Sequence, residues 1–173
     1  MHGHRQQTVI DGAVIDALNP ETRAFWLHLG TAVMCGGVIG VERQLRGKAA
    51  GIRTSILICL GTSIFVSLGA SLGADQADPT RVLAQVVSGI GFVGGGVILA
   101  REGLIIGVTS AAVIWVLAAL GALIGLGHLL ATIVLTLATL GILLGVELLE
   151  GAFRRLREGA TDRELESIEI EQG

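Results

Sequence analysis

The charged side chains, which are the groups able to bind ions or to carry acid–base chemistry, are few and lie in clusters. One cluster follows the first apolar run and contains Glu42, Arg43, Arg46, Lys48 and Arg53. Carboxylates bind hard cations such as Mg²⁺, whereas arginine and lysine form ion pairs and bind anionic headgroups. We take Glu42, Arg43 and Arg53 as candidate functional residues. In the simpler interpretation, these charges only flank an apolar segment.

A second set of polar candidates lies inside long uncharged stretches. Gln85 and Ser88 precede a glycine-rich run, and Thr109 and Ser110 lie in the next stretch. A primary amide has four hydrogen-bonding positions, which an apolar environment leaves unsatisfied. These four residues either line a polar cavity between two helices or make unrelated packing hydrogen bonds.

The sequence offers little for catalysis or for a structural metal site. It has no pairing of a nucleophile with a base and no HExxH motif, so we expect neither an enzyme nor a bound cofactor. Cys35 and Cys59 lack metal-ligand spacing and are interpreted as small buried residues. The run 89–94 matches the nucleotide-binding pattern GxGxxG, but it lies in an apolar stretch where no strand is expected. We therefore expect no nucleotide or nucleic acid as a partner, and metal binding stays open.

Composition indicates that membrane helices position these residues. The chain has 173 residues, of which 51% are apolar and only 16% charged, and its mean hydropathy is +0.73. A span needs about 20 apolar residues, and it must be helical because lipid offers backbone groups no other partner. Five stretches qualify, and we predict spans at Ala24–Val41, Thr54–Gly73, Val82–Ala100, Leu104–Gly125 and His128–Leu149.

The predicted fold is an all-α bundle of five transmembrane helices in the lipid bilayer. The loop 42–53 is basic and is assigned to the cytoplasm, whereas the loop 74–81 is acidic on balance and is assigned to the outside. The N-terminus is then outside and the C-terminus cytoplasmic. The predicted organisation is an N-terminal segment (1–23), a transmembrane domain (24–150) and a short cytoplasmic tail (151–173).

The spacing of the 26 glycines predicts how the helices pack. Glycines four residues apart occur in every predicted span, and such pairs let two helix backbones approach closely in lipid. We name Gly36, Gly40, Gly91 and Gly95 as packing residues, within one bundle or within a homo-oligomer, of which a dimer is favoured. The run Gly94–Gly96 weakens a helix. It marks either a break beside a cavity or a further close contact.

Several motifs occur together in the order and spacing of a known family. Over roughly residues 36–127 the chain resembles the MgtC/SapB family of bacterial inner-membrane proteins. The motifs are GVIGVER at Gly37–Arg43, KAAGIRT at Lys48–Thr54, DPTR at Asp78–Arg81, AQVVSGIGFVGGG at Ala84–Gly96 and GVTSAAVIW at Gly107–Trp115.

This resemblance implies a multi-pass protein of the bacterial inner membrane that is linked to magnesium limitation. Better-known members are described as regulators acting on the membrane ATP synthase. We therefore expect a regulator of magnesium homeostasis or membrane ion balance that works through helix–helix contacts with a membrane-protein partner. The alternative is a small oligomeric transporter or channel for an ion or small solute. Members of the MgtC type carry a further soluble domain, for which this chain has no room before Gly173, so we expect a shorter, SapB-like member.

Overall fold

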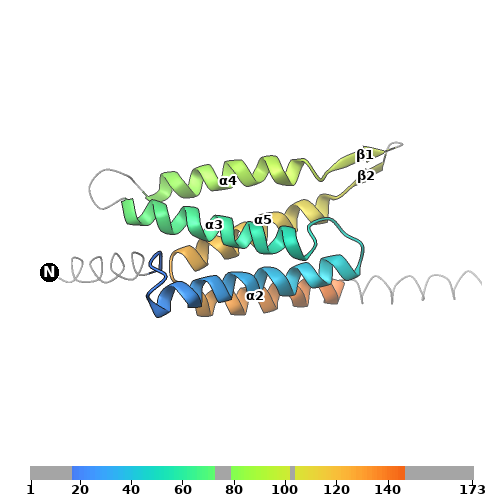
Figure 1. Ribbon diagram of the computed structural model, residues 1–173. Coiled ribbons are helices and arrows are strands. Elements are labelled where there is room, and N and C mark those ends of the chain that lie inside the picture. The colour runs from blue at the N-terminus through green and yellow to red at the C-terminus, as the bar shows by residue number, and fades with distance from the viewer. Residues whose placement is uncertain (1–16, 73–78, 102–103, 147–173) are drawn as a thin grey trace, which may run out of the picture. The chain divides into compact units, whose positions relative to one another are not determined.

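The computed structural model describes residues 17–72, 79–101 and 104–146. Two compact units, Met1–Leu137 and Ala138–Gly173, make up the chain, and the first contains all the labelled elements. A helix over Leu129–Val146 follows them. The labelled elements, in chain order, are α2 (Arg23–Leu45), α3 (Ile52–Leu72), α4 (Pro79–Gly95), β1 (Leu99–Arg101), β2 (Leu104–Ile106) and α5 (Val108–Gly125) (Figure 1).

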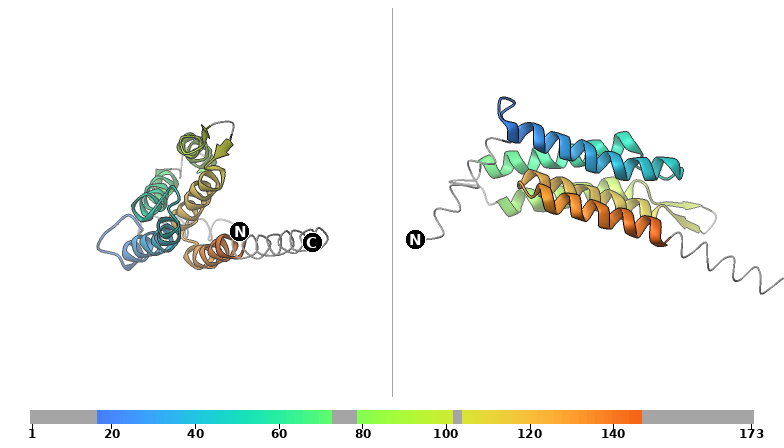
Figure 2. Two further views of the ribbon diagram at one scale, coloured as in Figure 1. Left: turned by 90° about the vertical axis from the view of Figure 1, so that its right-hand side faces the viewer. Right: turned by 90° about the horizontal axis from the view of Figure 1, so that it is seen from below.

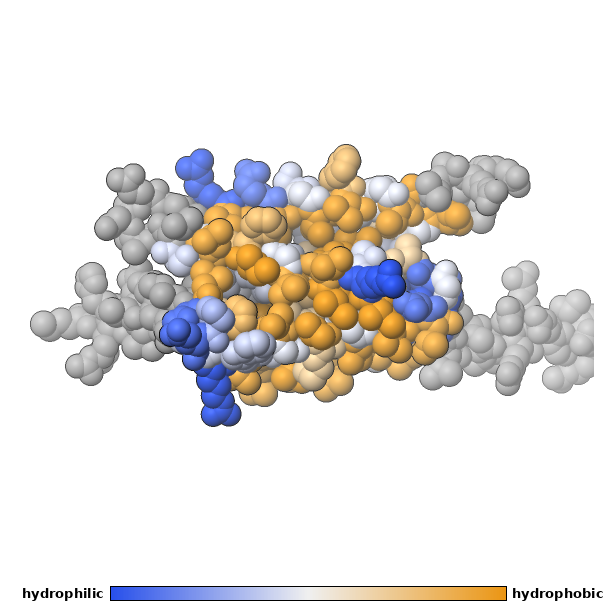
Figure 3. Space-filling view, viewed as in Figure 1, coloured by the Kyte–Doolittle hydropathy of each residue, from blue (hydrophilic) through white to orange (hydrophobic). Residues whose placement is uncertain are grey.

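The prediction of long apolar helices is confirmed for four of the five spans. Helices long and apolar enough to cross a membrane are Arg23–Leu45, Ile52–Ser71, Val108–Gly125 and Leu129–Val146, whereas Arg81–Gly95 is apolar but shorter. On the face shown in Figure 3, hydrophobic residues cover most of the surface and hydrophilic residues lie toward the two ends. A fifth crossing and the orientation of the chain stay predictions.

The predicted boundary between the third and fourth spans is wrong. The third span was expected to run to Ala100, but α4 ends at Gly95. The fourth was expected from Leu104, but α5 begins at Val108. Between them the strands β1 and β2 pair antiparallel as a short hairpin, so the described chain contains a pair of strands besides its helices. Apolarity alone did not separate the two possibilities, because a short apolar run is compatible with a strand or a helix.

Glycines set both ends of this hairpin. At the end of α4, the N–H of Gly96 donates to the carbonyl of Phe92 at 3.0 Å. The three consecutive glycines Gly94–Gly96 disfavour a further helical turn. At the start of α5, Gly107 has φ +92°, and a Cβ there would overlap the carbonyl oxygen of Val97. Both the left-handed backbone and the lack of space require glycine at this position.

Helices α3 and α5 lie between α2 and α4 and form the centre of the first unit (Figure 2, left). The backbone of α3 is approached by glycines from two sides, Gly36 and Gly40 of α2 and Gly121 and Gly125 of α5. A Cβ at Gly40 would lie only 2.6 Å from the Cα of Ile52. The core is therefore a contact between backbones, in which any larger side chain is excluded.

Small polar side chains of α3 use this proximity. The Cys59 thiol donates to the carbonyl oxygen of Leu117 at 3.3 Å, and the Ser67 hydroxyl donates to that of Gly125 at 3.0 Å. Both donors are buried. In lipid, such hydrogen bonds between helices add to van der Waals packing, so α3 and α5 are held together at two levels along their length.

Candidate functional site

The last turn of α2 brings two charged residues into the interior. Glu42 is 7% exposed and Arg43 is 3% exposed. The helix ends in a Schellman motif, in which Gly47 has φ +63° and its N–H donates to Gln44, while the N–H of Lys48 donates to the carbonyl of Arg43 at 3.0 Å. This cap satisfies the last carbonyls and turns the chain away, which leaves the final turn free to pack against α5.

Arg43 reaches from α2 to the first turn of α5. Its Nη2 atom donates a buried hydrogen bond of 2.7 Å to the hydroxyl oxygen of Ser110. Glu42 pairs instead with Arg46, one turn further on, where the Nε–Oε1 distance is 2.6 Å. These four residues form what we call the end cluster: Glu42, Arg43, Arg46 and Ser110.

Two buried atoms of the end cluster have no hydrogen-bond partner within the described chain. They are Glu42 Oε2, an acceptor, and Arg43 Nε, a donor. An unsatisfied buried polar group costs about 1–3 kcal/mol, and native proteins keep few of them outside functional, strained or hydrated places. The end cluster is therefore the strongest candidate site in the part of the chain that the structure describes.

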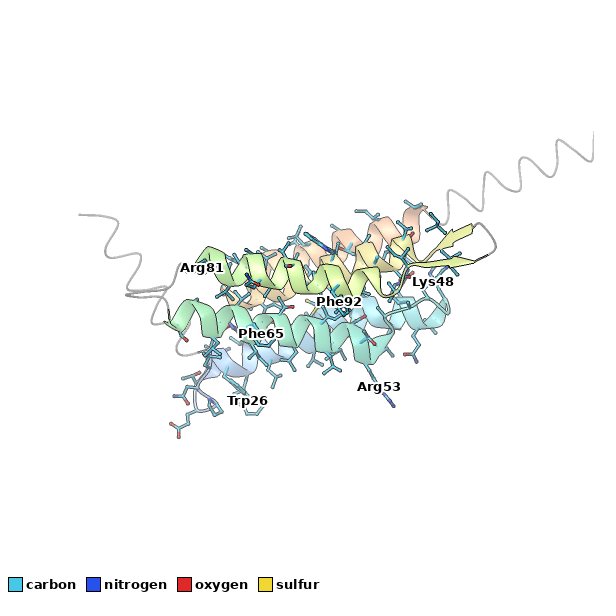
Figure 4. All side chains as sticks on the ribbon, turned by 90° about the horizontal axis from the view of Figure 1, so that it is seen from above. Trp26, Lys48, Arg53, Phe65, Arg81 and Phe92 are labelled. Carbon is cyan, nitrogen blue, oxygen red and sulfur yellow. The ribbon has the colours of Figure 1, made fainter. Side chains whose placement is uncertain are left out.

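The structure separates the charged residues that the sequence grouped. Glu42 and Arg43 are buried together, whereas Arg53 is exposed in the first turn of α3 and points away from the helices (Figure 4). Sequence reasoning did not single out Arg46 as the partner of Glu42. Its spacing of four residues was the signal, because such pairs are neighbours on a helix face.

The four intramembrane candidates are also divided. Ser110 is buried and belongs to the end cluster, while Thr109 beside it is exposed. Gln85 and Ser88 are exposed in the middle of α4. The cavity expected between α4 and α5 does not unite these residues. Where the two helices meet, a Cβ at Gly94 would already be in contact with α5.

Gln85 instead lines an open groove of about 420 Å³ between α3 and α4. The lining is mainly apolar, and a Cβ added at Gly61 or Gly89 in its walls would meet nothing within 4 Å. The same holds for Gly91 and Gly95, which were named as packing residues and are exposed here. The groove is lined by Leu57, Ile58, Gly61, Thr62, Phe65, Val82, Gln85, Val86, Gly89, Ile90 and Val93.

The four long apolar helices are those of a multi-pass α-helical membrane protein. Within this class the sequence matches one family. The MgtC family profile covers residues 29–152, and the chain belongs to the MgtC family.

Curated relatives share close to half of the aligned residues. A protein of Escherichia coli (strain K12) named "Putative magnesium transporter YhiD" is 46% identical over 113 residues, covering 61% of this chain and 53% of that protein. Protein MgtC of Brucella abortus (strain 2308) is 40% identical over 136 residues, 76% of this chain and 56% of the relative. Protein MgtC of Salmonella typhimurium (strain 14028s / SGSC 2262) is 42% identical over 119 residues, 66% and 50% respectively.

The chain thus spans about half the length of the curated relatives that it matches. No solved structure matches it.

Proposed function

We propose that this MgtC-family protein is a regulator in the bacterial inner membrane, linked to magnesium homeostasis or membrane ion balance, which acts through contacts between its helices and another membrane protein. The observation that carries this proposal is the close contact between helix backbones in the core. Backbones of α2, α3 and α5 are in contact at Gly40 and Gly121, and the thiol and hydroxyl groups of α3 at Cys59 and Ser67 are bonded to neighbouring carbonyls. Such a core favours action through the outer surface over conduction through the interior.

Two assays of the same protein test this proposal. A bacterial strain that lacks the chain should grow poorly when magnesium is limiting, and wild-type protein should restore growth. The purified protein in proteoliposomes should produce no uptake of Mg²⁺ or protons above protein-free vesicles. Normal growth of the lacking strain at limiting magnesium would contradict the regulatory role, and protein-dependent Mg²⁺ uptake would favour the second candidate.

That second candidate is a small oligomeric transporter for a divalent cation. It is favoured by the printed name of the Escherichia coli relative and by Glu42, whose buried Oε2 atom is unbonded within the described chain. Carboxylate oxygens are ligands that Mg²⁺ prefers. However, no group of three or more His, Cys, Asp or Glu side chains gathers among the described residues, so other oxygen ligands would have to complete the site.

A matched pair of variants separates this candidate from the first. If Glu42 is a ligand for transported Mg²⁺, Glu42→Gln should abolish the proteoliposome flux, because an amide oxygen carries no charge. Glu21→Gln, an equal change at an exposed residue that precedes α2, should leave the flux intact. A flux that both variants retain would exclude Glu42 as the cation ligand.

A further inference from the structure

The side chain of Gln85 makes no hydrogen bond with the described chain, although it lies within an apolar helix. It follows the start of α4 by six residues, which places it about 9 Å along the helix axis. Arg81, one turn earlier, is also exposed and provides the charge expected near a headgroup. At this depth hydrocarbon offers an amide no partner, and an unsatisfied amide is costly there.

The groove beside Gln85 has glycines in its walls that no neighbouring helix contacts. Between α2 and α3, a Cβ at Gly36 would lie 2.8 Å from the backbone of α3. Between α3 and α4, by contrast, Gly61 and Gly89 lie in the walls of the groove with nothing within 4 Å. Phe92, one turn after Gly89, is 86% exposed. Because Gly61 and Gly89 have no side chain, another helix can approach the backbones of α3 and α4 as closely as α2 approaches α3.

The amide distinguishes among the occupants that this groove would accept. An acyl chain would cover the apolar walls but leave Gln85 unsatisfied. A second copy of the chain inserts with the same orientation, so its own Gln85 arrives at the same depth. A primary amide carries both a donor and an acceptor, and two of them related by a two-fold axis along the membrane normal are therefore self-complementary.

We propose that the groove between α3 and α4 is the interface of a parallel homodimer, in which α4 of each copy packs on α4 of the other. Gly89 allows the two backbones to approach, and the two Gln85 amides hydrogen-bond across the two-fold axis. This proposal is independent of the regulatory role, because its readout is association alone.

Association in lipid vesicles tests the interface. Donor- and acceptor-labelled full-length chains are mixed and diluted with lipid, and resonance energy transfer gives the dimer fraction. Gly89→Leu should weaken dimerisation at least tenfold. Gly141→Leu is the matched control, since a Cβ there also meets nothing within 4 Å, and it should change dimerisation less than twofold. Both variants should fold, because a Cβ at either position meets no atom within 4 Å.

The amide pair has its own variant. Gln85→Leu keeps the size but removes the hydrogen bonds, and it should weaken dimerisation about threefold to thirtyfold, the range that corresponds to measured interhelical hydrogen bonds. Mild oxidation should join two copies of Gln85→Cys but not two copies of Val33→Cys, a control on the outer face of α2. Wild-type protein, with only the buried Cys35 and Cys59, gives the baseline.

Each remaining result would overturn the proposal. Wild-type chains that stay monomeric at every dilution exclude the dimer. A dimer that Gly89→Leu does not weaken, or that Gly141→Leu weakens equally, lies on another face. If Gly89→Leu displaces bound lipid without changing energy transfer, the groove holds an acyl chain. If Gln85→Leu associates as strongly as the wild type, the two Gln85 amides do not hydrogen-bond across the interface.

Discussion

Ser110 and Thr109 are neighbours in the first turn of α5, yet only one of them is held by a buried cation. Ser110 accepts the hydrogen bond from Arg43, whereas Thr109 is exposed. Ser110→Ala should lower the free energy of unfolding by about 1.5–3 kcal/mol, as expected for a hydrogen bond to a charged group. Thr109→Ala should change it by less than about 0.5 kcal/mol. Unfolding by denaturing detergent in mixed micelles measures both, and equal losses would show that the Arg43 contact contributes nothing.

The sequence predicted both ends of this contact but not the contact itself. Arg43 and Ser110 were assigned to different sets because they are separated by 67 residues, and no periodicity relates positions so far apart. Their meeting depends on the hairpin, which brings the chain from α4 back into α5. The pair of Glu42 and Arg46 was within reach of sequence reasoning, because the spacing of four residues is a local property of a helix.

At the scale of the secondary-structure elements, contacts between helices depend on single glycines, as Gly40 and Gly37 of α2 show. A Cβ at Gly40 would lie 2.6 Å from the Cα of Ile52, whereas one at Gly37 would make an ordinary contact of 3.7 Å with the Ile56 side chain. Gly40→Ala should therefore destabilise the protein by about 1–3 kcal/mol through overpacking. Gly37→Ala should be neutral or stabilising by up to about 1 kcal/mol, because alanine favours a helix.

Thermal unfolding in detergent compares the two alanine variants directly. A loss at Gly37 equal to that at Gly40 would mean that helix α2 does not sit as close to α3 as described. The sequence marked glycine pairs in all predicted spans, but spacing does not say which pairs meet a neighbour. Gly36 and Gly40 do, while Gly91 and Gly95 are open in the described chain, a difference that depends on tertiary arrangement.

At the scale of the whole molecule, apolar length predicted where most helices lie, since hydrocarbon thickness sets a minimum length. It failed between α4 and α5, where the glycine run and Gly107 interrupt the apolar stretches on either side of Arg101 and Glu102. A polar cavity between α4 and α5 was one of two alternatives that the sequence left open, and the groove of the described chain lies between α3 and α4. The positions of grooves and cavities depend on how the helices pack against one another, and amino-acid composition does not determine that packing.

The number of crossings gives a prediction at this scale. Helix α4 has 17 residues, a length of about 26 Å, and we predict that with the hairpin beyond it the chain still crosses the membrane. Lys48→Cys and Arg101→Cys should then resist an impermeant thiol reagent in intact cells and react in inside-out vesicles, while Asp75→Cys should react in intact cells. Arg101→Cys reacting from the same side as Asp75→Cys would instead mean that α4 does not cross.

Glycines bring helix backbones into contact in only part of the core, so local stability differs between the helices. Helices α2, α3 and α5 share backbone contacts, whereas α4 borders an open groove on its α3 side. Segments with fewer packed contacts open at lower free energy, and their amide hydrogens exchange sooner. Hydrogen–deuterium exchange of the protein in nanodiscs should therefore deuterate α4 before α3 and α5. Chain association through the α3–α4 groove should slow α4 selectively, so protection of one helix would report on assembly.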